Sequence, residues 1–104
     1  QLDRLIDIFA VREYMHQPFR TYSSGMLKKS GLLLSFLGPS RLVLLDEPFI
    51  TIDQQATENL TALIKEYFQN GTSFIVASHI DNQEMHLPFQ KVFLIKKAQI
   101  REEV

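Results

Sequence analysis

The 104-residue sequence contains no cysteine, no tryptophan and only four glycines. Without cysteine, disulfide bonds and thiolate metal sites are excluded. Long hydrophobic runs are absent too: the longest apolar stretch, residues 32–37, is interrupted by Ser35 and is far shorter than the roughly 20 residues that span a bilayer. No GxxxxGK[ST] sequence occurs, so these residues contain no complete phosphate-binding loop.

The composition is that of an ordinary globular protein, with 45% hydrophobic and 22% charged residues. The length is enough for one small domain with a modest core. Eleven basic and twelve acidic residues give a net charge of −1, which offers no general attraction to nucleic acid or anionic lipid. We therefore expect no nucleic-acid partner.

The most informative stretch is RLVLLDEP, residues 41–48. Its apolar run, 42–45, is too short for a typical helix and predicts a strand buried on both faces, as in the middle of a parallel sheet. Asp46 and Glu47 follow at once, and Pro48 ends the strand. Ligands bind at the carboxyl ends of strands in open α/β sheets, so the two acids are candidate functional groups. The alternative is an ordinary strand followed by an acidic turn and a helix cap.

The next segments predict a helix and a second strand. Asp53 is a good N-cap for a helix that Asn70 and Gly71 would close. Residues 73–77 then predict a second buried strand, with Ser78 and His79 at its end. A strand, a helix and a strand in this order form a right-handed βαβ unit with parallel strands. We therefore expect Asp46, Glu47 and His79 to meet at one edge of the sheet.

A polar segment, residues 21–26, precedes an apolar helix predicted over 24–37. Ser23 or Ser24 can cap this helix, and Gly25 permits close approach of a ligand to the backbone. With the positive end of the helix dipole, these residues could bind phosphate. A plain N-cap with a glycine in the first turn explains the same residues.

The remaining segments complete an α/β fold class with parallel central strands, flanking helices and a C-terminal β-hairpin. Apolar spacing predicts a helix over residues 1–10, with a further turn allowed over 11–15. A helix that starts at residue 1 is expected of a chain cut from something longer. Pro18 predicts extended backbone over 16–20, and residues 81–86 predict a short helix or loop. Residues 91–95 predict a third strand that turns back into the hairpin.

Four segments together resemble the ATP-binding cassette family. The sequence YSSGM, residues 22–26, resembles its LSGGQ signature, and LVLLDE, residues 42–47, resembles its Walker B strand with the following glutamate. Residues 49–53 resemble its D-loop, and Ser78-His79 resembles its switch histidine. The resemblance implies a partial P-loop NTPase fold. Residues 1–38 would be the end of the helical subdomain, and 39–104 the C-terminal part of a RecA-like ATPase core, in a single incomplete domain.

The resemblance implies roles for three residues at the sheet edge, with ATP and Mg²⁺ as cofactors. Asp46 would hold Mg²⁺ through water. Glu47 would polarise the attacking water, and His79 would contact the γ-phosphate. Phosphoryl transfer depends chiefly on positioning and charge compensation, so these residue types suit the chemistry.

The resemblance also implies contacts across a dimer with a second nucleotide-binding subunit. Ser23, Ser24 and Gly25 would face the nucleotide held by the opposite subunit, and Asp53 would link the two sites. The departures from the LSGGQ pattern are Tyr22, Ser24 and Met26.

We therefore expect the C-terminal fragment of an ABC transporter ATP-binding subunit, which hydrolyses ATP to drive transport. It would lie in the cytoplasm at the membrane, against a transmembrane subunit. Without a Walker A loop the isolated chain would be inactive, and its exposed apolar surface would promote self-association. The alternatives are a soluble non-transport ATPase of the same family and a non-catalytic interaction fragment. A zinc site is a further alternative, by ligand type, with His79, Asp81, Glu84 and His86.

Overall fold

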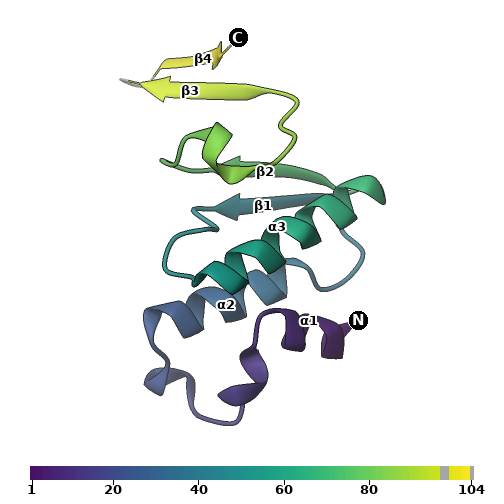
Figure 1. Cartoon of the computed structure of the whole chain (residues 1–104), viewed down its shortest axis with the longest axis vertical. Coiled ribbons are helices and arrows are strands. Elements are labelled where there is room, and N and C mark those ends of the chain that lie inside the picture. Colours follow the sequence, from purple (N-terminus) through teal and green to yellow (C-terminus); the bar gives the residue numbers. More distant parts are fainter. Residues whose placement is uncertain (97–98, 104) are drawn as a thin grey trace.

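The structure, a computed structural model, describes residues 1–96 and 99–103. It is an α/β fold with a small parallel sheet, and a separate hairpin lies beyond the sheet at the C-terminal end (Figure 1). The elements in chain order are α1 (Leu2–Ile8), η1 (Val11–Glu13), η2 (Phe19–Thr21), α2 (Ser24–Ser35), β1 (Leu42–Asp46), α3 (Gln54–Gln69), β2 (Ser73–Ala77), η3 (Asn82–Met85), β3 (Val92–Lys96) and β4 (Gln99–Glu103). None of the described helices is long and apolar enough to cross a membrane.

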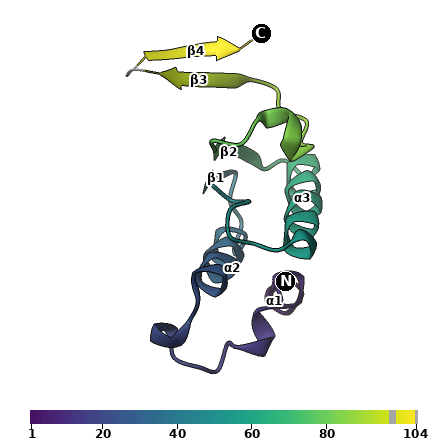
Figure 2. The same cartoon turned by 60° about the vertical axis from the view of Figure 1, so that its left-hand side comes forward.

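The sheet consists of β1 and β2, which pair in parallel from Leu42 opposite Ser73 to Asp46 opposite Ala77. This confirms the predicted βαβ unit. Figure 2 shows α3 lying along one face of the two strands. Val43 and Leu45 share one face of β1, because every second side chain of a strand faces the same way, and both are buried in one cluster with Leu60 of α3.

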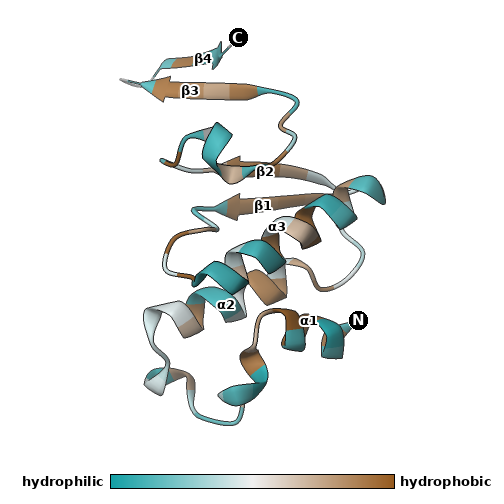
Figure 3. Ribbon diagram, in the orientation of Figure 1, coloured by the Kyte–Doolittle hydropathy of each residue, from teal (hydrophilic) through white to brown (hydrophobic). Residues whose placement is uncertain are grey.

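The predictions that β1 is buried on both faces and that β2 is a buried strand are wrong. Leu44 is 67% exposed and Ile75, its partner in the register, is 59% exposed. Figure 3 shows both strands as largely hydrophobic, although α3 covers one face only. An unbroken apolar run shows that a strand is hydrophobic on both faces. It does not show whether another element of this chain packs against each face.

The core lies between the sheet and the helices. Phe9 of α1's C-terminal end, Phe36 at the end of α2 and Leu60 of α3 are almost completely buried and belong to one cluster. Arg4 on α1 also forms a two-pronged ion pair with Glu66 on α3. Because both side chains are substantially exposed, packing of the apolar residues, more than this ion pair, holds α1 in place.

Both long helices begin as the sequence predicts. Ser23 caps α2, with its hydroxyl oxygen accepting the N–H of Met26 at 3.2 Å. Asp53 caps α3, with Oδ1 accepting the N–H of Ala56 at 2.7 Å. Each cap satisfies one of the backbone donors that a helix start leaves unpaired.

The ends of the chain follow the predictions in part. The helix near the N-terminus and the C-terminal hairpin are confirmed, with Val92 opposite Glu103 and Lys96 opposite Gln99. The extended segment predicted over 16–20 is wrong in part, because a 3₁₀ turn begins at Phe19. Pro18 itself is extended and starts that turn, a role its fixed φ allows. Of the predicted hairpin turn, residues 97 and 98 lie outside the described residues.

Two glycines of α2 provide a matched stability test. A Cβ on Gly31 would meet nothing within 4 Å, whereas one on Gly25 would lie 3.0 Å from the carbonyl oxygen of Thr51. Gly31→Ala should therefore raise the free energy of unfolding by about 0.5–1 kcal/mol, measured by urea denaturation. Gly25→Ala should give a smaller gain or a loss. An equal gain at both positions would show that the loop before α3 moves aside without cost.

Candidate functional site

The carboxyl edge of the sheet is built by the parallel pairing of β1 and β2. Asp46 lies opposite Ala77, and the N–H of Glu47 continues the pairing by donating to the carbonyl of Ala77 at 2.8 Å. Glu47 then takes a positive φ of 46°, which is uncommon for a residue with a side chain. The backbone thus leaves the strand at Glu47, and the residues that follow each strand lie side by side.

The Glu47 carboxylate is held by donors that follow β2. Its Oε1 accepts the backbone N–H of His79 at 2.8 Å and also contacts His79 Nδ1, while Oε2 accepts the Ser78 hydroxyl at 3.2 Å. These bonds favour the anion, so the pKa of Glu47 is lowered, first by the hydrogen bond with the His79 side chain. The His79 side chain is 97% exposed and Glu47 only 20%, so the pair opens toward solvent through the imidazole.

Asp46 presents an exposed side chain beside this pair. Its backbone carbonyl accepts a hydrogen bond from Lys28 Nζ on α2 at 2.9 Å. Among the described residues, no group of three or more His, Cys, Asp or Glu side chains could hold a metal ion. The zinc site considered from the sequence, with Asp81, Glu84 and His86 joining His79, therefore does not form.

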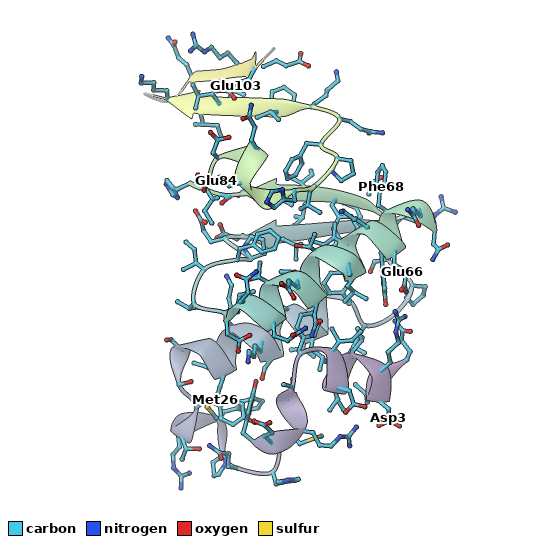
Figure 4. All side chains as sticks on the ribbon, viewed as in Figure 1. Asp3, Met26, Glu66, Phe68, Glu84 and Glu103 are labelled. Carbon is cyan, nitrogen blue, oxygen red and sulfur yellow. The ribbon has the colours of Figure 1, made fainter. Side chains whose placement is uncertain are left out.

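The turn predicted to bind phosphate lies at the start of α2. Figure 4 labels Met26 in the first turn of this helix, at the opposite end of the view from Glu103 on the terminal hairpin. Ser23 is the N-cap, and Ser24 begins the helix with an exposed side chain. Gly25 packs against the carbonyl of Thr51, so this turn touches the loop between β1 and α3. We call residues 23–25 the serine turn and residues 47–52 the connecting loop.

Both carboxylate oxygens of Asp53 accept hydrogen bonds within the chain. Besides capping α3 through Oδ1, Asp53 accepts a hydrogen bond from Lys29 Nζ on Oδ2 at 3.1 Å. The pKa of Asp53 is lowered, first by the Ala56 N–H and then by Lys29. Its predicted role across a dimer stays a prediction.

The structure brings Asp46, Glu47 and His79 to one edge, as predicted from the βαβ pattern. The serine turn approaches the connecting loop that follows this edge, with Gly25 against the carbonyl of Thr51. Sequence reasoning missed the contacts of Ser78, Lys28 and Lys29. Lys28 and Lys29 stand three and four residues after Gly25, which places all three on one helical face, and that spacing was a readable signal.

Comparison with known proteins shows to which family the chain belongs. The family described as "AAA domain, putative AbiEii toxin, Type IV TA system" matches residues 14–82, which is most of the chain and includes both strands of the parallel sheet. Curated relatives along the chain are ATP-binding cassette proteins. The chain belongs to this family of AAA-type ATPase domains, as an ATP-binding cassette nucleotide-binding domain.

Three relatives illustrate the range of similar proteins. The chain is 29% identical, over its full length, to the uncharacterized ABC transporter ATP-binding protein YdbJ of Bacillus subtilis. It is 28% identical to the lantibiotic transport ATP-binding protein SrtF of Streptococcus pyogenes, over 68% of the chain. It is also 28% identical to human ATP-binding cassette sub-family A member 2, over 82% of the chain. The aligned residues cover 34%, 31% and 4% of the length of these relatives respectively, so the chain matches only a part of each.

The donors around Glu47 can be tested by titration. His79→Ala removes the largest cause of the lowered pKa, so the pKa of Glu47 should rise toward its ordinary value, and Ser78→Ala should raise it less. Carboxyl-carbon NMR measures both, with exposed Glu58 as the internal control. Because the fold lowers this pKa, the associated stability is present above the ordinary pKa of glutamate and is lost as pH falls through the lowered value. An unchanged pKa in His79→Ala would contradict the arrangement.

Proposed function

We propose that the chain supplies the water-activating part of an ATP-hydrolysing site, and that hydrolysis drives transport. The observation that carries this proposal is the meeting of the Glu47 carboxylate with His79 beside Asp46, at the carboxyl edge of two parallel strands. Ligands of open α/β sheets bind at this edge. An acid, an imidazole and a second acid at one edge provide groups for orienting water, contacting phosphate and holding a cation.

The donor set fits magnesium if most ligands come from elsewhere. Mg²⁺ is usually bound through one or two carboxylates, with waters and substrate phosphates filling its other positions. Asp46 offers one exposed carboxylate, and the described residues offer no larger cluster. Asp46 would therefore hold the ion, directly or through water. The ion would supply charge compensation for the phosphate oxygens.

The lowered pKa of Glu47 indicates how this residue would act. A carboxylate held by three donors is a weak proton acceptor, but it still orients and polarises a water through its remaining lone pairs. Phosphoryl transfer passes through a loose transition state in which positioning matters more than complete proton removal. Glu47 would thus place the water, while His79, held against it, would face the phosphate.

The other half of the site would come from outside these residues. The sequence contains no GxxxxGK[ST] loop, and the chain spans about a third of the length of its bacterial relatives. The proposed complete site takes its phosphate loop from a further segment. Ser23, Ser24 and Gly25, at the start of α2, would face nucleotide held by a second subunit, because a helix start offers positive dipole and free N–H groups. The Ser23 hydroxyl accepts the capping bond and still has a proton to donate.

The transport role rests on the relatives, two of which are named as transporter or transport ATP-binding proteins. We place the chain at the cytoplasmic side of a membrane, against a transmembrane subunit and a second nucleotide-binding subunit. Leu42, Leu44 and Ile75, exposed on the uncovered sheet face, support the expectation that the isolated chain self-associates. A non-transport ATPase of the same family would use the same groups for hydrolysis.

The role of Glu47 is tested by Glu47→Gln in the complete ATPase. The amide keeps the shape and loses the charge, so turnover should fall by about 10²–10⁴-fold, whereas the nucleotide Kd should stay within a few-fold. Hydrolysis and equilibrium binding are measured separately. Glu58→Gln, an exposed acid on α3, is the matched control and should keep normal turnover. Normal turnover by Glu47→Gln would reject Glu47 as the residue that activates water.

Titration of residues 1–104 with ATP and magnesium, followed by calorimetry, tests whether these residues need a phosphate loop from a further segment to bind nucleotide. We expect no detectable binding, because the phosphate loop is absent from the sequence. Adding a chain that carries the missing loop should restore binding. Tight binding by residues 1–104 alone would mean that they form a nucleotide site of another kind. Failure of any combination to hydrolyse ATP would favour the non-catalytic interaction fragment.

A further inference from the structure

One face of α2 contacts the connecting loop and the residues on either side of it. Gly25, Lys28 and Lys29 are spaced i, i+3 and i+4 and so share this face. Gly25 packs on the loop itself, against the carbonyl of Thr51. Lys28 reaches Asp46, just before the loop, and Lys29 reaches Asp53, just after it. Three consecutive contacts therefore follow the backbone from the end of β1 to the start of α3.

Lys28 fixes the backbone at the first end. Its ammonium donates to the carbonyl oxygen of Asp46 at 2.9 Å, at the last residue of β1. Lys28 also lines a groove of about 200 Å³ between α2 and β1, together with Leu27, Leu44 and Leu45. The lysine stem covers this apolar surface while its charged end reaches the polar edge. The contact is one residue before Glu47, so it fixes the point from which the Glu47 backbone turns.

Lys29 fixes the second end. Its side chain is only 17% exposed, and its ammonium lies 3.1 Å from Asp53 Oδ2. The other carboxylate oxygen of Asp53 caps α3, so one carboxylate joins two helices. A charge on a largely covered side chain benefits from such a partner, because burial of an unpaired charge is costly. Loss of Lys29 would leave the α3 cap but free the loop end from α2.

We propose that Lys28 and Lys29 are positioning residues that hold the acids at the sheet edge in a fixed relation to the serine turn. The inference rests on the proposed function, in which the sheet edge and the serine turn face nucleotide. Neither lysine needs to touch nucleotide in this role. Each acts through the residue it holds, Lys28 through the backbone of Asp46 and Lys29 through the carboxylate of Asp53. The two phosphate-facing parts of the chain would then move as one unit.

The contact is tested without nucleotide in residues 1–104. Lys29→Met keeps most of the apolar stem and removes the ammonium, so the pKa of Asp53 should shift upward in carboxyl-carbon NMR. Lys29→Arg should restore a lowered value. Lys65→Met, which removes an exposed lysine of α3, should leave it unchanged. An unchanged Asp53 pKa in a folded Lys29→Met variant would overturn the proposal.

A second measurement on the unmodified chain covers the case in which Lys29→Met fails to fold. The Lys29 Nζ protons should exchange with water more slowly than those of Lys65, because the ammonium is hydrogen-bonded to Asp53 and the side chain is only 17% exposed. Equal exchange rates would overturn the proposal.

Steady-state kinetics of the complete ATPase tests the positioning role. Misplacement of reacting groups by about 1 Å can cost about 10²-fold, so Lys28→Met and Lys29→Met should each lower kcat by about 10- to 100-fold. KM for ATP should change far less, and Lys29→Arg should recover part of kcat. Unchanged kcat, or a raised KM with normal kcat, would overturn the role. Absence of hydrolysis by the unmodified ATPase would reject the proposed function, and the Asp53 titration would then still decide whether the contact exists.

Discussion

The structure depends on the parallel register between β1 and β2. With Asp46 opposite Ala77, Glu47 is the first residue beyond β1 and Ser78 the first beyond β2, so the three donors of residues 78 and 79 reach one carboxylate. A slip by one residue would turn every side chain of a strand to the other face. It would expose Val43 and Leu45 and would also separate Glu47 from its donors. Core packing and the geometry of the candidate site are therefore set by the same constraint.

The sequence predicts well where the physical cause is local. The caps at Ser23 and Asp53 follow from side chains that can accept backbone N–H groups within their own turn, and the structure confirms both. The meeting of Asp46, Glu47 and His79 also follows from the sequence, since strand, helix and strand in order bring two carboxyl ends to one edge. The sequence alone therefore predicts which residues meet at the candidate site, and their chemical roles stay predictions.

The sequence predicts poorly where the cause lies in distant parts of the chain. Four consecutive apolar residues predict burial of β1 on both faces, but whether Leu44 is covered depends on which elements pack on that face, and α3 covers only the other. The partners of Lys28 and Lys29 likewise depend on how α2 lies against β1. Helical spacing could show that both lysines share a face with Gly25, but not that this face meets the connecting loop.

These contacts reconcile two features of Glu47 that otherwise conflict. A lowered pKa makes a carboxylate a poor base, yet the proposed reaction assigns Glu47 to water activation. If the transition state is loose, the requirement is a negative charge at a fixed position more than a strong proton acceptor. Hydrogen bonds from Ser78 and His79 stabilise the negative charge and fix much of its position. Lys28 holds the backbone of Asp46 and Lys29 holds the carboxylate of Asp53, so that the carboxylate, its donors and the serine turn are parts of one connected arrangement.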